Sequence, residues 1–108
     1  MFQGTQLVFY TQQNHQHAGQ PLHSWLLAEA QRTGLQGGSA HYAAEGFGRH
    51  RRMHAAHFFE LADQPVEIVF ILSSEQARLF LEHLRQEQVS VFYVCIPVEY
   101  GVLGEKDA

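Results

Sequence analysis

The residues best suited to chemistry are gathered between Glu45 and His57, where three arginines and three histidines follow or flank two glycines. Guanidinium groups, together with glycine backbone N–H groups, can hold a phosphate or a carboxylate. Gly-Phe-Gly alone does not have the spacing of a P-loop or a dinucleotide motif, so a solvated basic loop is an equal alternative. The predicted ligand-binding residues are Gly46, Phe47, Gly48, Arg49, Arg51 and Arg52.

The histidines of the same segment suggest a second kind of site. His50, His54 and His57 are spaced i, i+4 and i+7, which places them on one face if the segment is helical. Such a set could bind zinc, copper or nickel, and His15 and His17 could add to it in an oligomer. No cysteine or acidic residue accompanies the three at a recognised metal spacing. A solvated loop with polar histidines is therefore the competing interpretation.

The serines give no support to catalysis. They stand at predicted helix starts or in predicted strands, where capping and packing explain them, and no nucleophile elbow is present. We therefore expect a protein that is not an enzyme.

Length, charge and composition limit the number of domains, the classes of partner and the cellular compartment. A chain of 108 residues predicts a single domain over residues 1–108, with a core at about 5–98 and a tail at 99–108. The formal net charge of -4 argues against nucleic acid as a partner. No apolar run approaches the roughly 20 residues that cross a bilayer, so no membrane insertion is expected. Cys95, the only cysteine, is predicted to be buried, which is consistent with a reducing cytoplasm.

Hydrophobic periodicity predicts an α+β fold in the order βαββαβ. Two crossover helices connect the strands, which gives a ferredoxin-like sandwich: a four-stranded antiparallel sheet with both helices on one face. Pro97 predicts that the last strand lies at an edge of the sheet. The expected strands are 6–11, 39–45, 66–72 and 89–98, and the expected helices run from Pro21 to about Thr33 and from Ser73 or Ser74 past Leu84.

The predicted strands 66–72 and 89–98 are apolar on both faces. Two helices can cover only one face of the sheet, and a monomer rarely exposes an apolar patch of more than a few hundred Å². We therefore expect a closed homo-oligomer in which the uncovered faces pack together.

Several motifs carry a resemblance to a known family. They are Ala18-Gly19-Gln20-Pro21-Leu22, Gly34-Leu35-Gln36-Gly37, Glu45-Gly46-Phe47-Gly48, Met53-His54 and Asp63-Gln64-Pro65-Val66. Together they resemble the PII-like family catalogued as domain of unknown function number 190, over roughly residues 5–98.

The resemblance implies a homotrimer with a signalling role. Effectors of PII-like proteins, often adenine nucleotides, bind between subunits, and a long loop contacts a partner that is commonly a membrane transporter. That loop corresponds here to residues 46–57, with its glycine base toward the ligand. The alternative is a metal-binding trimer similar in fold to the divalent-cation-tolerance proteins, which would use the loop histidines.

Overall fold

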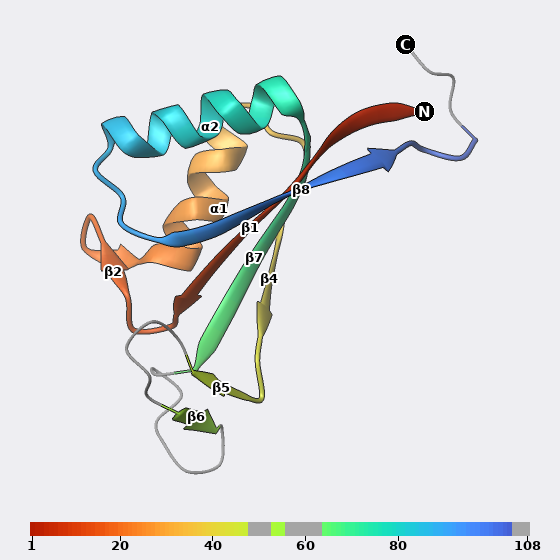
Figure 1. The fold of residues 1–108 in the computed structure, drawn as a ribbon. Coiled ribbons are helices and arrows are strands. Elements are labelled where there is room, and N and C mark those ends of the chain that lie inside the picture. The colour runs from red at the N-terminus through yellow and green to blue at the C-terminus, as the bar shows by residue number, and fades with distance from the viewer. Residues whose placement is uncertain (48–52, 56–63, 105–108) are drawn as a thin grey trace.

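A central pair of antiparallel strands organises the fold. The computed structural model describes residues 1–47, 53–55 and 64–104. Within these residues, a four-stranded sheet has the order β4-β7-β1-β8, and all its neighbouring strands are antiparallel (Figure 1). The elements are β1 (Phe2–Gln12), β2 (Gln16–His17), β3 (Gln20–Pro21), α1 (Leu22–Arg32), β4 (Ser39–Tyr42), β5 (Glu45–Phe47), β6 (Met53–Ala55), β7 (Pro65–Ser73), α2 (Ser74–Gln86) and β8 (Phe92–Tyr100).

The predicted α+β, ferredoxin-like architecture is confirmed. The order of β1, β4, β7 and β8 across the sheet, with α1 and α2 as crossovers, is that of the βαββαβ sandwich. β8 forms one edge of the sheet, as Pro97 predicted, because an edge strand tolerates a residue without a backbone N–H.

Both helices cover the same face of the sheet. Leu7 and Phe9 of β1 and alternate residues of β7 point toward α1 and α2 and form one cluster with them. The expected packing roles of Trp25 and Phe80 are confirmed, since their side chains are 8% and 3% exposed. The cluster consists of Leu7, Phe9, Leu22, Trp25, Leu26, Ala30, Val66, Ile68, Phe70, Leu72, Ala77, Phe80 and Leu84.

Among the residues that the structure describes, no helix covers the opposite face of the sheet (Figure 1). Here Val8 lies between Val69 and Val94 in the strand register. Gln6 is flanked by Ile71, 45% exposed, and Ile96, 42% exposed. We call this surface the open face, and it confirms that the sheet is apolar on both sides. Its central residues are Gln6, Val8, Tyr10, Glu67, Val69, Ile71, Phe92, Val94 and Ile96.

Several element boundaries differ from the expectation. β1 begins at Phe2 and β8 continues to Tyr100, because the two strands pair as far as Phe2 opposite Tyr100. The expected strand 39–45 divides into β4, which pairs with β7, and β5, which pairs with β6. The expectation of a buried Cys95 is wrong: it lies on the edge strand β8, and its side chain is exposed.

The start of α2 is fixed by a capping box. Ser73 Oγ accepts a hydrogen bond from the Gln76 backbone N–H, and the Ser73 backbone N–H donates to Gln76 Oε1, both at 3.1 Å. We expect Ser73→Ala to lower the free energy of unfolding by about 1 kcal/mol, measured by urea denaturation. Ser90→Ala, at an exposed position outside the helices, should change it much less; equal losses in the two variants would contradict the capping role.

A candidate ligand site at the loop neck

The two ends of segment 44–63 are held together by three residues, Ala43, Gln64 and Pro65, which we call the loop neck. The Ala43 backbone N–H donates to the Pro65 carbonyl at 2.9 Å, and Gln64 Nε2 donates to the Ala43 carbonyl at 3.3 Å. The Gln64 carbonyl accepts from the Gln13 backbone N–H at 2.9 Å. The neck is therefore bonded both across the segment and to the turn that follows β1.

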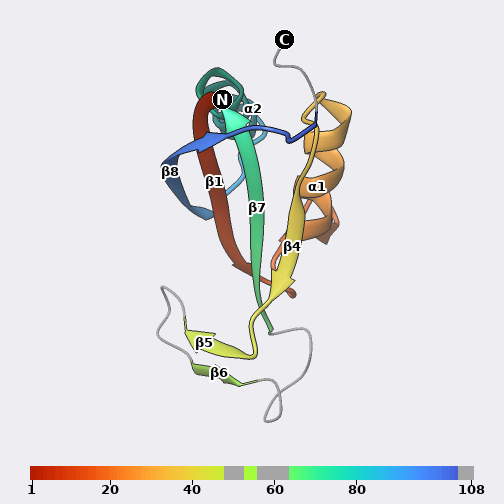
Figure 2. The ribbon, with the colours of Figure 1, turned by 90° about the vertical axis from the view of Figure 1, so that its right-hand side faces the viewer.

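Beyond the neck, two short strands form a separate hairpin ladder. β5 and β6 pair antiparallel, with Gly46 opposite His54 and Phe47 opposite Met53. Both views place β5 and β6 beyond the end of the sheet where β4 stops and β7 starts (Figures 1 and 2). Two of the predicted ligand-binding residues, Gly46 and Phe47, therefore lie in β5, which follows Ala43 of the neck closely in the sequence. Gly48, Arg49, His50, Arg51, Arg52 and His57 lie outside the described residues.

The proposed metal site assumed that the segment carrying His50, His54 and His57 is helical, and the structure contradicts this assumption at His54. His54 belongs to the strand β6, so a single helical face cannot run through it. His50 and His57 lie outside the described residues, and metal binding by the three histidines stays a prediction. Within residues 1–47, 53–55 and 64–104, no group of three or more histidine, cysteine, aspartate or glutamate side chains is placed to hold a metal ion.

A two-stranded ribbon of residues 16–21 follows the turn that is bonded to the neck. The ribbon closes through Ala18 and Gly19, whose φ angles are 52° and 80°. Positive φ at both central residues is the geometry of a type I′ hairpin turn. The His17 ring packs edge-on against Trp25 of α1, with ring centroids 4.4 Å apart. The ribbon is therefore anchored on α1.

His15 connects the turn after β1 to the strand before it. Thr11 Oγ1 and His15 Nδ1 are 2.9 Å apart, and the His15 backbone N–H donates to the Gln12 carbonyl. Burial lowers the pKa of His15, and the nearby His17 lowers it further. His15 and His17, proposed from the sequence as additional metal ligands, have these structural partners, and metal binding by them stays a prediction.

His23 is a buried histidine that the sequence analysis did not single out. Its side chain is 8% exposed, and its Nδ1 atom has no hydrogen-bond partner among the described residues. The ring packs edge-on against Tyr42, with centroids 6.0 Å apart, one residue before the neck. Burial lowers the pKa of His23, because charging a desolvated imidazole is unfavourable. Its position three residues before Leu26, on the apolar stripe of α1, was the available sequence signal.

This pKa shift makes stability depend on pH. Because the pKa of His23 is lowered in the folded state, the unfolded chain binds the proton at a higher pH than the folded chain. The free energy of unfolding should therefore decrease as the pH falls below about 6.5, the ordinary histidine value. His23→Leu should show a shallower decrease in urea titrations between pH 7 and 5. An unchanged slope in His23→Leu would assign the pH dependence to other groups, among them His15, whose pKa is also lowered by burial.

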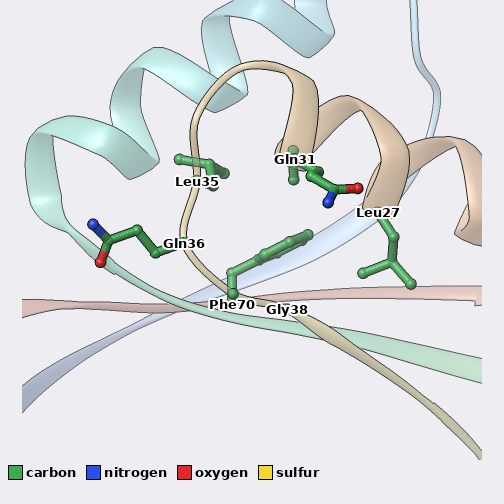
Figure 3. Close-up of a pocket in the computed structure, with 8 residues that line it drawn as sticks. Leu27, Gln31, Leu35, Gln36, Gly38 and Phe70 are labelled. Atoms are coloured by element: carbon green, nitrogen blue, oxygen red, sulfur yellow. The ribbon is translucent and has the colours of Figure 1, made fainter.

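One pocket lies at the other end of β4, away from the neck. It has a volume of about 270 Å³ and lies between the last turns of α1, residues 35–38 and β7 (Figure 3). Its lining carries no ionisable group, and its aromatic residue, Phe70, is only 1% exposed. The pocket therefore does not provide the anion site expected from the sequence. Its lining residues are Leu27, Ala30, Gln31, Leu35, Gln36, Gly37, Gly38 and Phe70.

The sequence analysis also missed Gln64 and Gln13 as parts of the site. Asp63-Gln64-Pro65-Val66 entered the sequence analysis only as a motif of the family resemblance. The β4–β7 register, which ends with Tyr42 opposite Val66, is needed to bring the Gln64 side chain to the Ala43 carbonyl. Among the described helices, none is long and apolar enough to cross a membrane.

Comparisons with known proteins identify relatives in sequence and in structure. The profile of the family described as "DUF190: Uncharacterized ACR, COG1993" matches residues 4–99. A UPF0166 protein of Aquifex aeolicus (strain VF5) is 28% identical over 80 residues, which cover 73% of this chain and 76% of that protein.

Two solved structures share the fold. A proposed PII-like signaling protein from Thermus thermophilus superposes with a TM-score of 0.64 at 19% identity, over 91% of each chain. CPII, a nitrogen regulatory PII-like protein from Thiomonas intermedia bound to ADP, AMP and bicarbonate, gives 0.61 at 22% identity, over 90% of this chain and 89% of that one. The fold is therefore that of PII-like proteins.

Proposed function

The chain belongs to the DUF190 family, and from this membership and its PII-like fold we propose that it is a trimeric, non-enzymatic regulator. A small effector, which we take to be an adenine nucleotide, binds between subunits at the loop neck. The 46–57 loop then contacts a protein partner, such as a membrane transporter. The nucleotide is proposed because CPII, which shares the fold, is described as bound to ADP and AMP.

The observation that carries the proposal is the bonded neck beneath a glycine- and arginine-rich segment. Ala43 and Pro65 hold the two ends of this segment at the margin of the sheet, where β4 ends and β7 begins. Arginine guanidinium groups bind phosphate through charge-assisted, often bidentate hydrogen bonds. Glycine allows the backbone to approach a ligand closely. Arg49, Arg51 and Arg52 are thus proposed to hold the phosphate groups, with Gly46 and Gly48 at the base.

The open face supports the trimer. Its exposed residues include Ile71 and Ile96, and also Tyr10 and Phe92, which are 42% and 49% exposed. A second copy of the chain offers the same apolar surface, so self-association removes both surfaces from water. We propose that the loop necks lie near the subunit boundaries of this trimer, where an effector could contact two chains.

Isothermal titration calorimetry with AMP, ADP and ATP tests the proposed effector. We expect saturable heat with at least one of them and a matching rise in thermal stability, since a ligand of the folded state stabilises it. No heat with any of the three at millimolar nucleotide would contradict nucleotide binding. The trimer has a separate test and does not depend on this result.

A further inference from the structure

Gln64 joins two segments that are distant in the sequence. Its side-chain Nε2 donates to the carbonyl of Ala43, at the end of β4, while its own carbonyl accepts from the Gln13 backbone N–H. The two bonds, of 3.3 and 2.9 Å, leave opposite ends of one residue. Gln64 is half-buried, so these groups have only partial access to water as an alternative partner.

The turn that Gln64 reaches is itself held by several bonds. Thr11 Oγ1 and His15 Nδ1 are 2.9 Å apart, and the His15 backbone N–H donates to the Gln12 carbonyl at 3.0 Å. The His15 carbonyl accepts from the Leu22 backbone N–H at 2.7 Å, at the start of α1. The turn is thereby bonded to both β1 and α1.

Pro65 of the neck already pairs with Gln12 at the end of the β1–β7 ladder, and the two bonds of Gln64 add a link from this turn to Ala43 at the end of β4. We propose that Gln64 is a latch, a positioning residue that couples the turn at residues 12–15 to the loop neck. The coupling is a property of the free protein. Its regulatory role rests on the proposed function. An effector bound at the neck would shift the position of the turn at residues 12–15, and by thermodynamic reciprocity a shift of this turn would alter the affinity for the effector.

Amide hydrogen exchange, followed by NMR without any effector, tests the coupling. Gln64→Ala removes the side-chain hydrogen bond to the Ala43 carbonyl. It keeps the Gln64 carbonyl, which accepts from the Gln13 N–H, and the Pro65 carbonyl, which accepts from the Ala43 N–H. We expect exchange at the amides of both Gln13 and Ala43 to rise about fivefold, as for the loss of one net hydrogen bond. A rise at Ala43 alone would mean that the two segments are independent, and would overturn the latch.

Thr11→Val perturbs the same path from the other end. This nearly isosteric change removes the Oγ1 contact to His15, and we expect faster exchange at Ala43 when Gln64 is present. In the Gln64→Ala background, the same change should not accelerate exchange at Ala43 any further. Equal effects in the two backgrounds, or no effect in either, would contradict coupling through Gln64.

Two controls separate the latch from a general loss of stability. Gln36→Ala changes an exposed glutamine of the α1–β4 connection and should leave the amides of Gln13 and Ala43 unchanged. Amides of the central β1–β7 ladder should exchange at the wild-type rate in all variants; faster exchange there would show that the neck effect is global and would count against the proposal. Since no effector is present, failure of the latch and failure of nucleotide binding are distinct results.

Discussion

Ile71→Lys is expected to convert a trimer into monomers in size-exclusion chromatography with light scattering, at micromolar protein concentration. Ile71 lies on the open face, 45% exposed, and flanks Gln6 opposite the similarly exposed Ile96. Fully burying an exposed isoleucine contributes roughly 1.5–3 kcal/mol, and Ile71, at 45% exposed, would contribute a part of this on association, whereas an unpaired ammonium at the same place must be desolvated. In the proposed trimer, three-fold symmetry would repeat this cost in every subunit, so one substitution should be sufficient.

Leu79→Lys is the matched control for this experiment. Leu79 is a similarly exposed aliphatic residue, at 53%, but it belongs to α2 on the helical side of the sheet. The variant should remain a trimer, and both variants should retain the wild-type circular dichroism spectrum. A wild-type chain that is monomeric at micromolar concentration would contradict the trimer, and dissociation of both variants would place the interface elsewhere.

The fold was predictable because its strongest elements have regular patterns. Val66, Ile68, Phe70 and Leu72 alternate along β7, and this apolar stretch predicted a strand. The structure places all four on the helix-covered face. Ser73 or Ser74 predicted the start of α2, and the capping box in the structure identifies Ser73 as the cap. Both signals are local in sequence, so no tertiary information was needed to read them.

The misjudged residues depend on contacts between distant segments. Cys95 has an apolar neighbourhood in sequence, but whether an edge strand is covered depends on where the helices lie above the sheet. Gln64 reads as an ordinary turn residue until the register places it beside Ala43 and Gln13. His23 is polar, yet the docking of α1 buries it against Tyr42. Composition and periodicity cannot supply these positions.

The triple variant Arg49→Ala/Arg51→Ala/Arg52→Ala should weaken nucleotide binding by at least about tenfold in calorimetry, which corresponds to about 1.4 kcal/mol. A hydrogen bond to a charged group contributes about 1.5–3 kcal/mol, so losing even one phosphate contact is enough for this effect. The weakening should diminish at high salt, because salt screens the attraction in the wild-type protein. Equal affinity of the variant and the wild type would remove the arginines from the site.

The chain supplies a control with the same change in charge. Three other arginines lie on the helices in i, i+3 ion pairs with glutamates. The pairs of Arg78 and Arg85 are exposed and of a kind that contributes little to stability, whereas the exposed Arg32 pairs with a Glu29 side chain that is 10% exposed. Replacing all three with alanine removes the same three positive charges and should leave nucleotide affinity near the wild-type value if binding depends on the loop rather than on net charge. These arginines are Arg32, Arg78 and Arg85, paired with Glu29, Glu75 and Glu82.

Substituting the loop histidines distinguishes nucleotide binding from metal binding in the same set of measurements. His50→Ala/His54→Ala/His57→Ala should leave nucleotide affinity unchanged if the arginines hold the phosphates, because neutral imidazoles add little to phosphate binding. If the histidines bind metal instead, this variant alone should lose zinc or copper affinity, while the arginine variant keeps it. A nucleotide defect in both variants would indicate that the whole 46–57 loop, rather than the arginines alone, must be intact for binding.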